Sequence, residues 1–248
     1  MNILDIIFSH RTIRKYKKQN IDSKLLKTIL EAGTKASNTG NMQVYSIIVT
    51  TNEDIKASLS PTHFNQSMVR EAPVVLTFCA DFNRFNKWCL QRKAQPGYDN
   101  FLSFMTASID ALLVAQNVCI AAEANGLGIC YLGTVIYNAD KIIEILKLPK
   151  GVVPVATVTL GYPDENPELT DRLPLEAIIH EEFYHDYTTK DIDKFYSEKE
   201  NMPLYKGFVE ENNKETLSQV FTDVRYTKNG NEHFSNVLFN VLKKQGFL

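Results

Sequence analysis

The longest apolar stretch of the chain, from Phe101 to Thr134, predicts a buried helix followed by a strand. Its first two-thirds contain neither Gly nor Pro and are apolar nearly all round, which is typical of a helix enclosed on most sides. Ser103, Asp110 and Asn117 recur every seven residues and therefore fall on one narrow polar stripe. Spacing alone leaves two interpretations of this stripe: a buried polar seam, or the solvated edge of a core helix.

Glycines mark the end of this helix and of the strand after it. Gly126 can take the left-handed conformation that closes a helix, and the apolar run 129–132 predicts a strand. Gly133, directly after that run, can let the backbone approach a flat ligand where a side chain would be in the way. This order of helix, glycine, strand and glycine indicates a possible shelf for a ligand.

The rest of the pattern predicts further helices and strands up to about residue 160. Apolar residues at helical spacing, or in short runs, predict helices at 2–9, 21–32, 53–59 and 138–146, and strands at 44–51, 74–80 and 152–160. Asp22 or Ser23 is the expected N-cap of the second helix and Gly33 its stop. The aromatic segment 82–97 is predicted to be a mobile covering element.

The C-terminal part of the chain has a different character. The segments 188–200 and 213–225 are charged and weakly amphipathic. The final helix, by contrast, has a regular apolar face made of Phe234, Val237, Leu238, Val241 and Leu242. An apolar face on an outlying tail needs a surface to cover, and a second subunit can provide one.

Charge and composition exclude several classes of function. The 248 residues can form one large domain or two small ones, and the net charge of -2 gives no basic field for nucleic acid or an anionic membrane. A membrane span through residues 101–124 is disfavoured because Asp110, Gln116, Asn117 and Glu123 would enter hydrocarbon. We therefore expect neither nucleic acid nor membrane as a partner.

The four cysteines lack a CxxC pair, and three of them lie in apolar runs, as reduced and buried thiols do. The N-terminal stretch contains Asp5 and no small-residue cleavage site, so it does not resemble a signal peptide. Both features favour a cytoplasmic location. His63 has no second His or Cys at metal spacing, and we predict no metal site.

Candidate binding chemistry is concentrated in two loops. The segment 10–15 contains five groups that can donate to an anion, and arginine forks are the best side-chain match to a phosphate. A solvated basic turn is the plain alternative. The polar run 36–43 comes directly before a predicted strand, where binding residues often collect, although an ordinary turn has the same composition.

Together these segments resemble the FMN-dependent nitroreductase superfamily, and within it the flavin-reductase type of oxygen-insensitive nitroreductase. The resemblance runs in the same order through about residues 3–185. The segments that carry it are His10-Arg11-Thr12-Ile13-Arg14, the loop 37–43, the run 78–84, Ala115-Gln116-Asn117, Gly126-Leu127-Gly128, Tyr131-Leu132-Gly133, the run 146–149, Gly161-Tyr162-Pro163, Asn166-Pro167 and Arg172-Leu173-Pro174.

The resemblance implies an α+β fold with a small, mainly antiparallel sheet flanked by helices, in a domain-swapped homodimer. Residues 1–187 would form the FMN-binding domain, and residues 188–248 a C-terminal helical extension that wraps the partner subunit. Two FMN molecules would lie at the subunit interface, with the central helix in the dimer core.

Position by position, the resemblance also implies a set of cofactor-binding residues. The residues expected near the FMN phosphate are His10, Arg11, Thr12, Arg14 and Arg172. Those expected near the ribityl chain or the ring edge are Asn38, Gly40, Gln43 and Gln66. Those expected beside the isoalloxazine are Tyr131, Leu132, Gly133 and Thr134. No side chain is expected to act as a catalytic nucleophile, because the flavin carries the chemistry.

The sequence departs from the family pattern in two places. The phosphate loop of the family commonly reads Lys-x-Arg, and here Thr170 takes the first position while Arg172 remains. In the flavin-reductase type a basic loop grips the 2'-phosphate of NADPH, but here the region 203–215 contains Glu210, Glu211 and Glu215. The expected reductant is therefore NADH or NADPH, without an assigned preference.

The implied activity is an NAD(P)H-dependent reduction of nitroaromatics, quinones or related small electron-poor acceptors by ping-pong hydride transfer. Two alternatives remain open from the sequence. One is an NAD(P)H:FMN oxidoreductase that supplies reduced flavin to a partner, and the other is a flavin-binding protein without turnover.

Overall fold

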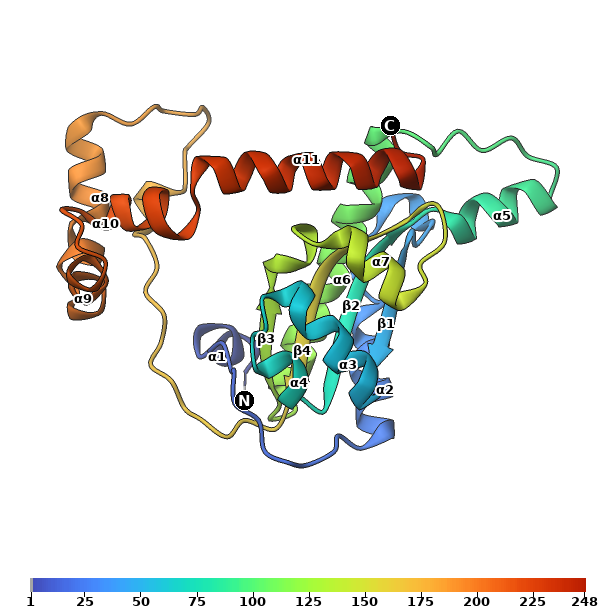
Figure 1. Ribbon diagram of the computed structural model, residues 1–248, viewed down its shortest axis with the longest axis horizontal. Coiled ribbons are helices and arrows are strands. Elements are labelled where there is room, and N and C mark those ends of the chain that lie inside the picture. The colour runs from blue at the N-terminus through green and yellow to red at the C-terminus, as the bar shows by residue number, and fades with distance from the viewer. Residues whose placement is uncertain (1) are drawn as a thin grey trace. The chain divides into compact units, whose positions relative to one another are not determined.

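The chain folds around a four-stranded antiparallel sheet in the computed structural model, which describes residues 2–248 (Figure 1). The strands lie in the order β1-β2-β4-β3, and every neighbouring pair is antiparallel. Their bounds are β1 (Tyr45–Thr50), β2 (Val74–Asp81), β3 (Gly128–Leu132) and β4 (Val152–Gly161). The predicted small antiparallel sheet is confirmed, and each strand lies within a residue or so of its predicted position.

Helices make up most of the remaining structure. The α-helices are α1 (Ile3–Phe8), α2 (Ser23–Gly33), α3 (Glu53–Leu59), α4 (Met68–Glu71), α5 (Asn83–Gln91), α6 (Phe101–Ala124), α7 (Ala139–Leu146), α8 (Thr189–Asn201), α9 (Pro203–Glu211), α10 (Leu217–Gln219) and α11 (Lys228–Gln245). Short helical turns are η1 (Thr39–Asn41), η2 (Ser60–His63), η3 (Gly133–Ile136), η4 (Leu175–Ala177) and η5 (Val220–Arg225), the last a π-helix. The predicted helices are all present.

Contacts divide the chain into two compact units. The first runs up to Glu168 and includes Phe234–Leu248, and the second is Leu169–His233. The sheet and helices α1 to α7 belong to the first unit, and α8, α9 and α10 belong to the second. The functional division expected at residue 187 stays a prediction.

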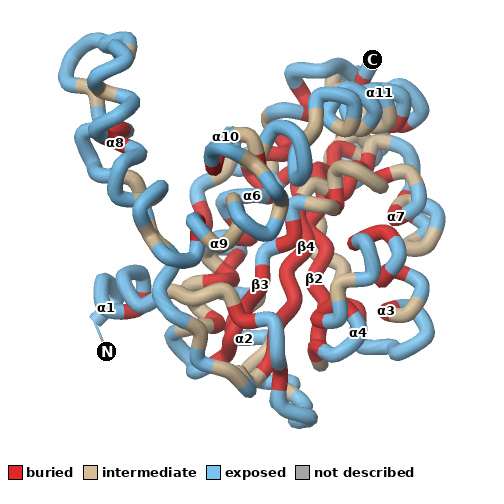
Figure 2. The backbone as a smooth tube through the Cα atoms, turned by 60° about the vertical axis from the view of Figure 1, so that its left-hand side comes forward, coloured by how far each residue is buried: buried red, intermediate tan, exposed pale blue. Residues whose placement is uncertain are grey.

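The central strands β2 and β4 are buried on both faces and are red in Figure 2, whereas the edge strand β1 is only partly buried. On one face Leu76, Phe78 and Val158 pack against α2 and α6. On the other face a second cluster joins β3 to α3, α4 and α7. The near-continuous apolar runs of β2 and β4 follow from this double coverage. Pro154, which cannot donate to the ladder, lies at a register shift opposite Phe78 and Cys79.

Helix α6 is the central core helix that the sequence predicts. Ser103 and Asp110 are buried, with Asp110 only 1% exposed, so the polar stripe is a buried seam there and not a solvated edge. The helix ends in a Schellman motif, with Leu127 N donating to Ala122 O at 3.1 Å and Gly126 at a φ of 75°. By length and hydropathy α6 could cross a membrane, but half of the residues in its most apolar stretch are buried inside the protein.

One expectation about α2 is wrong. Gly33 is the last residue of the helix and not its stop. A Cβ at this position would lie 2.3 Å from Cγ2 of Val118, so glycine allows α2 to pack closely on α6. The N-cap prediction is confirmed, because the Asp22 carboxylate accepts from the backbone of Lys24 and Leu25 at 3.0 Å.

The C-terminal helix is covered differently from the expectation. Val241 and Leu242 of α11, with Phe247 after it, are buried in a cluster with Phe104 and Val153 of the same chain. This part of the apolar face therefore needs no second subunit. An apolar stripe does remain open on α6, and its exposed residues are Leu102, Met105, Ile109, Leu112 and Leu113.

The aromatic segment after β2 is more regular than predicted. Residues 83–91 form helix α5, and Phe82 at its start is buried in the same cluster as Phe104. All four cysteines are free and buried, in keeping with the prediction of buried reduced thiols. Burial raises the pKa of the Cys119 thiol to about 12, which makes this group unreactive near neutral pH.

Candidate functional site

The predicted phosphate-binding segment lies along the free edge of β3. Thr12 and Ile129 form a parallel bridge, and Ile13 N donates to Ile129 O at 2.8 Å. A Cβ at Gly128 would lie 2.6 Å from Cγ1 of Ile13, so glycine in β3 permits this close pairing. The pairing fixes the backbone between Arg11 and Arg14 on the sheet.

Carboxylates and carbonyls position the segment further. Nδ1 of His10 lies 2.6 Å from Oε1 of Glu123 at the end of α6. Arg11 Nε donates to Pro167 O at 2.8 Å. Oε1 of Glu165 accepts from the backbone N of Arg14 at 2.5 Å and of Lys15 at 3.0 Å. These contacts hold the backbone, the imidazole and the guanidinium of Arg11, which within residues 2–248 donates only to uncharged carbonyl groups.

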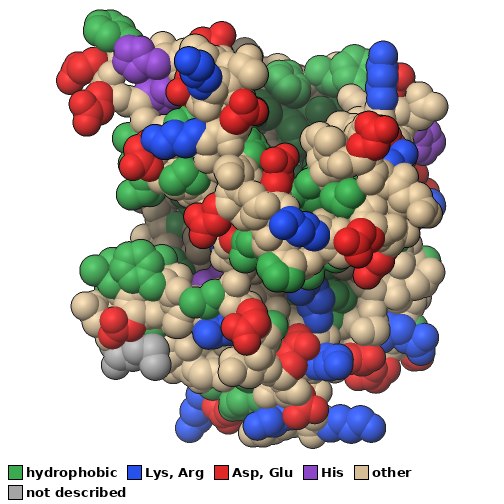
Figure 3. Space-filling model, turned by 90° about the vertical axis from the view of Figure 1, so that its left-hand side faces the viewer, with side chains coloured by type: hydrophobic (Ala, Val, Ile, Leu, Met, Phe, Trp, Pro, Cys, Tyr) green, Lys and Arg blue, Asp and Glu red, His purple; other side chains and the backbone are tan. Residues whose placement is uncertain are grey.

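The positive charge of the arginines stays available. Within residues 2–248, no ion pair engages the guanidinium of Arg11, Arg14 or Arg172. Elsewhere acidic and basic side chains are interspersed, as on the face shown in Figure 3, in keeping with the net charge of -2. The arginines are therefore local positive charges and not part of a broad basic surface.

The turn after β3 contains the residues predicted to lie beside the flavin ring. The Tyr131 side chain is 40% exposed, and burial of the rest raises its pKa to about 12. Leu132 is buried in the core, so only its backbone can face a ligand. A Cβ at Gly133 would meet no atom within 4 Å, which leaves open space at the start of η3.

His63 joins this turn, which the sequence did not predict. Its Nδ1 lies 2.8 Å from Oγ1 of Thr134, and its carbonyl accepts from Nε2 of Gln66 at 3.1 Å. The imidazole is fully buried, and burial lowers its pKa to about 4, so it is neutral at pH 7. Its Nε2 has no hydrogen-bond partner among residues 2–248. No local signal links His63 to Thr134, because 71 residues separate them.

Asn38, Gly40 and Gln43 lie at the opposite edge of the sheet, in the turn before β1. Asp110 of α6 fixes this turn, since its Oδ1 accepts from N and Oγ1 of Thr39 at 2.9 and 3.1 Å. Oδ1 of Asn38 is buried without a hydrogen-bond partner in the described part of the chain. Such an orphaned oxygen requires a donor from a ligand, water or partner.

The contacts on helix α6 show how far the segment that begins at His10 lies from the Asn38 to Gln43 turn. His10 contacts Glu123, and Thr39 contacts Asp110, thirteen residues earlier on the same helix. At 1.5 Å per residue these contacts are about 20 Å apart. The two edge strands are also separated by β2 and β4, or about 14 Å across the sheet. One chain therefore brings together His10 to Arg14, Gln66 and the 131–134 turn, but not the Asn38 to Gln43 turn.

Arg172 belongs to the second unit. Its Nη1 donates to the carbonyls of Thr170 and Asp171 at 3.2 and 2.9 Å. The Asp171 carboxylate accepts from Lys199 Nζ at 2.8 Å and from the hydroxyl of Tyr205. Burial acts to raise the pKa of Asp171, but the hydrogen bonds from Lys199 and Tyr205 outweigh it and lower the pKa. This cluster anchors the 170–172 turn to α8 and α9.

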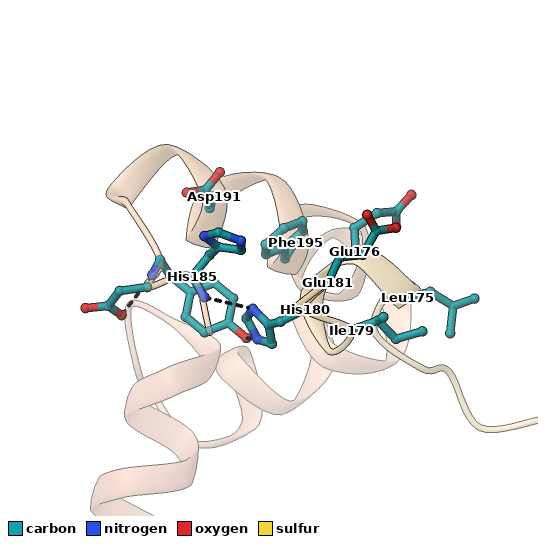
Figure 4. Close-up of a pocket in the computed structure, with 10 residues that line it drawn as sticks. Leu175, Glu176, Ile179, His180, Glu181, His185, Asp191 and Phe195 are labelled. Atoms are coloured by element: carbon teal, nitrogen blue, oxygen red, sulfur yellow. Dashed lines mark hydrogen bonds between the residues drawn. The ribbon is translucent and has the colours of Figure 1, made fainter. Parts of the chain in front are cut away.

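The second unit also contains a pocket of about 560 Å³ that the sequence did not predict (Figure 4). It is lined by His180, His185 and several carboxylates and aromatic rings. His180 is engaged on both ring nitrogens, because Nδ1 accepts from His185 N at 3.3 Å and Nε2 lies 3.2 Å from the Tyr187 hydroxyl. That hydroxyl donates to Ala177 O at 2.9 Å. His180 thus serves as a structural link in this pocket.

Known proteins share this fold and sequence. The Nitroreductase family matches residues 7–162. The FMN reductase (NADPH) of Bacillus subtilis is 33% identical over 212 residues, covering 81% of this chain and 85% of that protein. The oxygen-insensitive NADPH nitroreductase of Salmonella typhimurium is 32% identical over 204 residues, covering 82% and 83%. A crystal structure from Bacteroides fragilis is 57% identical, with a TM-score of 0.97 over 98% of this chain and 99% of that chain.

The fold and the sequence together define the class of this protein. The family match covers more than half of the chain, and the two curated relatives exceed 30% identity over four-fifths of it. The chain belongs to the nitroreductase family. The resemblance seen in the sequence is thereby confirmed, including its fold.

Proposed function

We propose that the chain is an FMN-dependent NAD(P)H oxidoreductase that reduces nitroaromatics, quinones or related small electron-poor acceptors. The observation that carries the proposal is the pairing of Thr12 and Ile13 with Ile129. It lays two arginines, which form no ion pair within residues 2–248, along the sheet edge that ends in the open Gly133 turn. The relatives named FMN reductase and NADPH nitroreductase support it.

The residues present fit FMN. Arginines suit its phosphate, and the side-chain amides of Asn38, Gln43 and Gln66 can both donate and accept, as a pyrimidine ring edge requires. Asn38 has a buried oxygen without a partner in the described chain, and Gly133 leaves space where a side chain would project. When bound, FMN supplies the redox chemistry, taking a hydride from the nicotinamide and passing electrons to the acceptor.

The chain itself contributes binding and positioning. Arg11, Arg14 and Arg172 would hold the phosphate, and the backbone at Leu132 and Gly133 would face the ring. His63 is neutral and buried, so it can orient the Thr134 hydroxyl through their 2.8 Å contact without adding charge to the site. Reductant and acceptor would use the same open site in turn, and protons can come from solvent.

We further propose that two copies of the chain assemble each site. The Asn38 to Gln43 turn contacts α6 about 20 Å from the point where His10 contacts the same helix. At this distance the two groups of one chain would not both contact the ring of the same FMN. The exposed apolar stripe of α6 supports a homodimer, because such a stripe is rarely left open to water. The partner's turn would then complete the site, and the segment 188–233 would wrap the partner.

The choice of nicotinamide follows from residues 203–215. Lys214 is paired with Asp223 at 2.9 Å. Lys206 is the other cation in the sequence of this segment, which also contains three glutamates. The relatives' names include NADPH. We expect this chain to discriminate less strongly, with NADH and NADPH giving kcat/KM values within about tenfold, since a single lysine replaces a basic loop. We also propose a cytoplasmic location, which the four buried free cysteines support.

The direct experiment is an absorption spectrum of the purified protein followed by anaerobic titration with each nicotinamide. A yellow protein that bleaches with NADH or NADPH and regains colour on addition of a nitroaromatic or quinone supports the proposal. A second candidate, an oxidoreductase that supplies reduced FMN to a partner, is favoured by the relative named FMN reductase. Faster turnover with free FMN than with any nitroaromatic identifies it, and a yellow protein that never bleaches identifies a flavin-binding protein without turnover.

A further inference from the structure

A groove of about 570 Å³ lies between the turn before β1 and helix α5. Its lining is Gly40, Asn41, Met42, Arg84, Phe85 and Trp88. The volume is in the range of small-molecule sites. The groove adjoins the Gly40 to Gln43 turn that the proposed function places at the flavin ring edge, and the inference drawn from it rests on that function.

One wall of the groove is an ordered aromatic surface. Phe82 is buried and stacks on Tyr98 at 4.9 Å between centroids, and Phe85 meets Tyr98 edge-on at 5.4 Å. Phe85 in turn holds Trp88, whose ring centroid is 5.4 Å away. Trp88 nevertheless remains 54% exposed. An aromatic ring supported from behind and open in front is suited to stacking on a flat ligand.

The groove has a positive charge and no negative one in its described lining. Arg84 is its charged residue, and one guanidinium nitrogen donates to Gln43 O. Four of the five N–H donors of the guanidinium are left by that single contact. Within residues 2–248 the nearby Asp81 forms no ion pair with the guanidinium; its carboxylate accepts from the Ser46 hydroxyl and from the backbone N of Arg84. Arg84 can therefore receive an anionic group.

The opposite wall is a turn in an uncommon conformation. Gly40, Asn41 and Gln43 have φ values of 56°, 56° and 53°. Left-handed backbone is unfavourable for a residue that has a Cβ, so the surrounding contacts must hold such a turn in place. The contact of Arg84 with Gln43 O helps to hold the turn in this conformation.

We propose that this groove is the acceptor subsite and that it selects flat aromatic acceptors with an anionic substituent. The ring lies against Trp88 and Phe85, and the anion is bound by Arg84. Neutral quinones and nitroaromatics use only the aromatic wall and bind more weakly. Arg84 is thus a specificity residue, and no covalent step is assigned to it.

Trp88 is the single tryptophan of the chain, so its fluorescence reports on this groove. The test titrates the FMN-loaded protein with 4-nitrobenzoate and with its neutral methyl ester, and follows quenching corrected for absorbance. The variants are Arg84→Gln and, as a matched control, Lys87→Gln, which removes an exposed cation from the same helix but outside the lining. Binding of the neutral ester measures any effect that the Arg84 substitution has on the turn itself and not on the anion.

The expected result is saturable quenching by both ligands, with the carboxylate bound more tightly. Arg84→Gln raises the Kd of 4-nitrobenzoate about five- to tenfold, the loss of one charge-assisted contact, and that of the ester less than about twofold. Lys87→Gln changes neither. The ratio of kcat/KM for carboxylate over ester falls by the same factor in Arg84→Gln.

Two results overturn the inference: the absence of saturable quenching, and equal weakening of both ligands in Arg84→Gln. The second would show that Arg84 only supports the turn. The quenching measurement needs no turnover, so it tests the groove separately from the proposed function. If the protein binds 4-nitrobenzoate through Arg84 but never oxidises NADH or NADPH, the proposed function is contradicted. The anion selectivity of the groove is then still supported.

Discussion

Nδ1 of His10 lies 2.6 Å from Oε1 of Glu123, the residue before the last one of α6. The contact ties the predicted phosphate segment to one end of the helix, while Thr39 is tied to Asp110 nearer its middle. The predicted cofactor residues therefore form two groups in one chain, and helix α6 keeps them about 20 Å apart. Pairing two chains is the simplest way to bring one group of each to the same flavin.

The arginines are expected to recognise the FMN phosphate specifically. In an Arg14→Ala, Arg172→Ala double variant, the Kd of FMN should rise at least about a hundredfold, because two guanidinium contacts to a dianion are lost. Riboflavin, which has no phosphate, should bind the variant and the parent within about twofold. Equilibrium dialysis of both flavins measures this difference. Lys17→Ala is the matched control, and a double variant that purifies with full yellow occupancy would show that the phosphate assignment is wrong.

The buried imidazole of His63 is expected to make stability depend on pH. Its pKa is about 4 in the folded chain against 6.5 for the ordinary group, because burial penalises the charged form. Between these pH values the unfolded chain binds more protons than the folded chain. The contribution of His63 to the free energy of unfolding is therefore complete above pH 6.5 and decreases as the pH falls to 4, by about 3 kcal/mol in total. Urea unfolding of the parent and of His63→Gln at pH 7 and pH 4.5 checks this.

The histidine variant should lack this part of the pH dependence, while acidic groups elsewhere contribute equally to both proteins. Parallel losses of stability in the two proteins would contradict the assignment of a neutral, buried His63. The Thr134 contact at 2.8 Å predicts a second effect, a weaker flavin affinity in His63→Ala than in His63→Gln, since glutamine can still reach a hydroxyl.

The Tyr205 hydroxyl is expected to affect flavin binding through Arg172. It donates to Asp171, which also accepts from Lys199 at 2.8 Å, and the two contacts hold the turn before Arg172. Tyr205→Phe should raise the Kd of FMN about three- to tenfold, the value of one hydrogen bond. Tyr226→Phe is the control, since this ring stacks on Phe221. In an Arg172→Ala background the Tyr205→Phe change should add nothing, and a full additional loss there would exclude a positioning role.

The open stripe of α6 is expected to form the subunit interface. Ile109 and Leu113 are 52% and 43% exposed, and Ile109→Glu with Leu113→Glu places two charges on this surface. Sedimentation velocity should then show a monomer, and the flavin should be lost with the dimer, because burying unpaired charges is costly. Ile55→Glu, on the 40% exposed Ile55 of α3, is the control. A yellow monomer would contradict the two-chain site.

The sequence predicted the elements of the fold well where periodicity is strong. The bounds of α3 and the long α6 follow from local patterns, and the Asp22 cap follows from side-chain chemistry. Helix α5 was missed although Phe85, Trp88 and Cys89 have helical spacing, because the segment is short, rich in polar residues and held by packing of Phe85 on Phe82. The coverage of Val241 by the core of its own chain was missed because a regular apolar face does not show which surface it packs against.

The candidate site was predictable in part. Arginine pairs and amide-rich turns show their chemistry in the residue types themselves, so the segments 10–14 and 38–43 could be found without a structure. Their separation could not, since it depends on which parts of α6 they contact. The contact of His63 with Thr134 and the groove beside Arg84 also join residues far apart in the sequence, and no local pattern marks them.

The most direct measurement is complementation between two colourless variants produced together. One carries Arg14→Ala and Arg172→Ala, and the other carries Asn38→Ala and Gln43→Ala. If each flavin site takes one group from each chain, half of the randomly formed dimers are mixed and each contains one intact site, so about a quarter of all sites should regain FMN. Flavin absorbance that stays at the level of the separately produced variants would contradict a site shared between two chains.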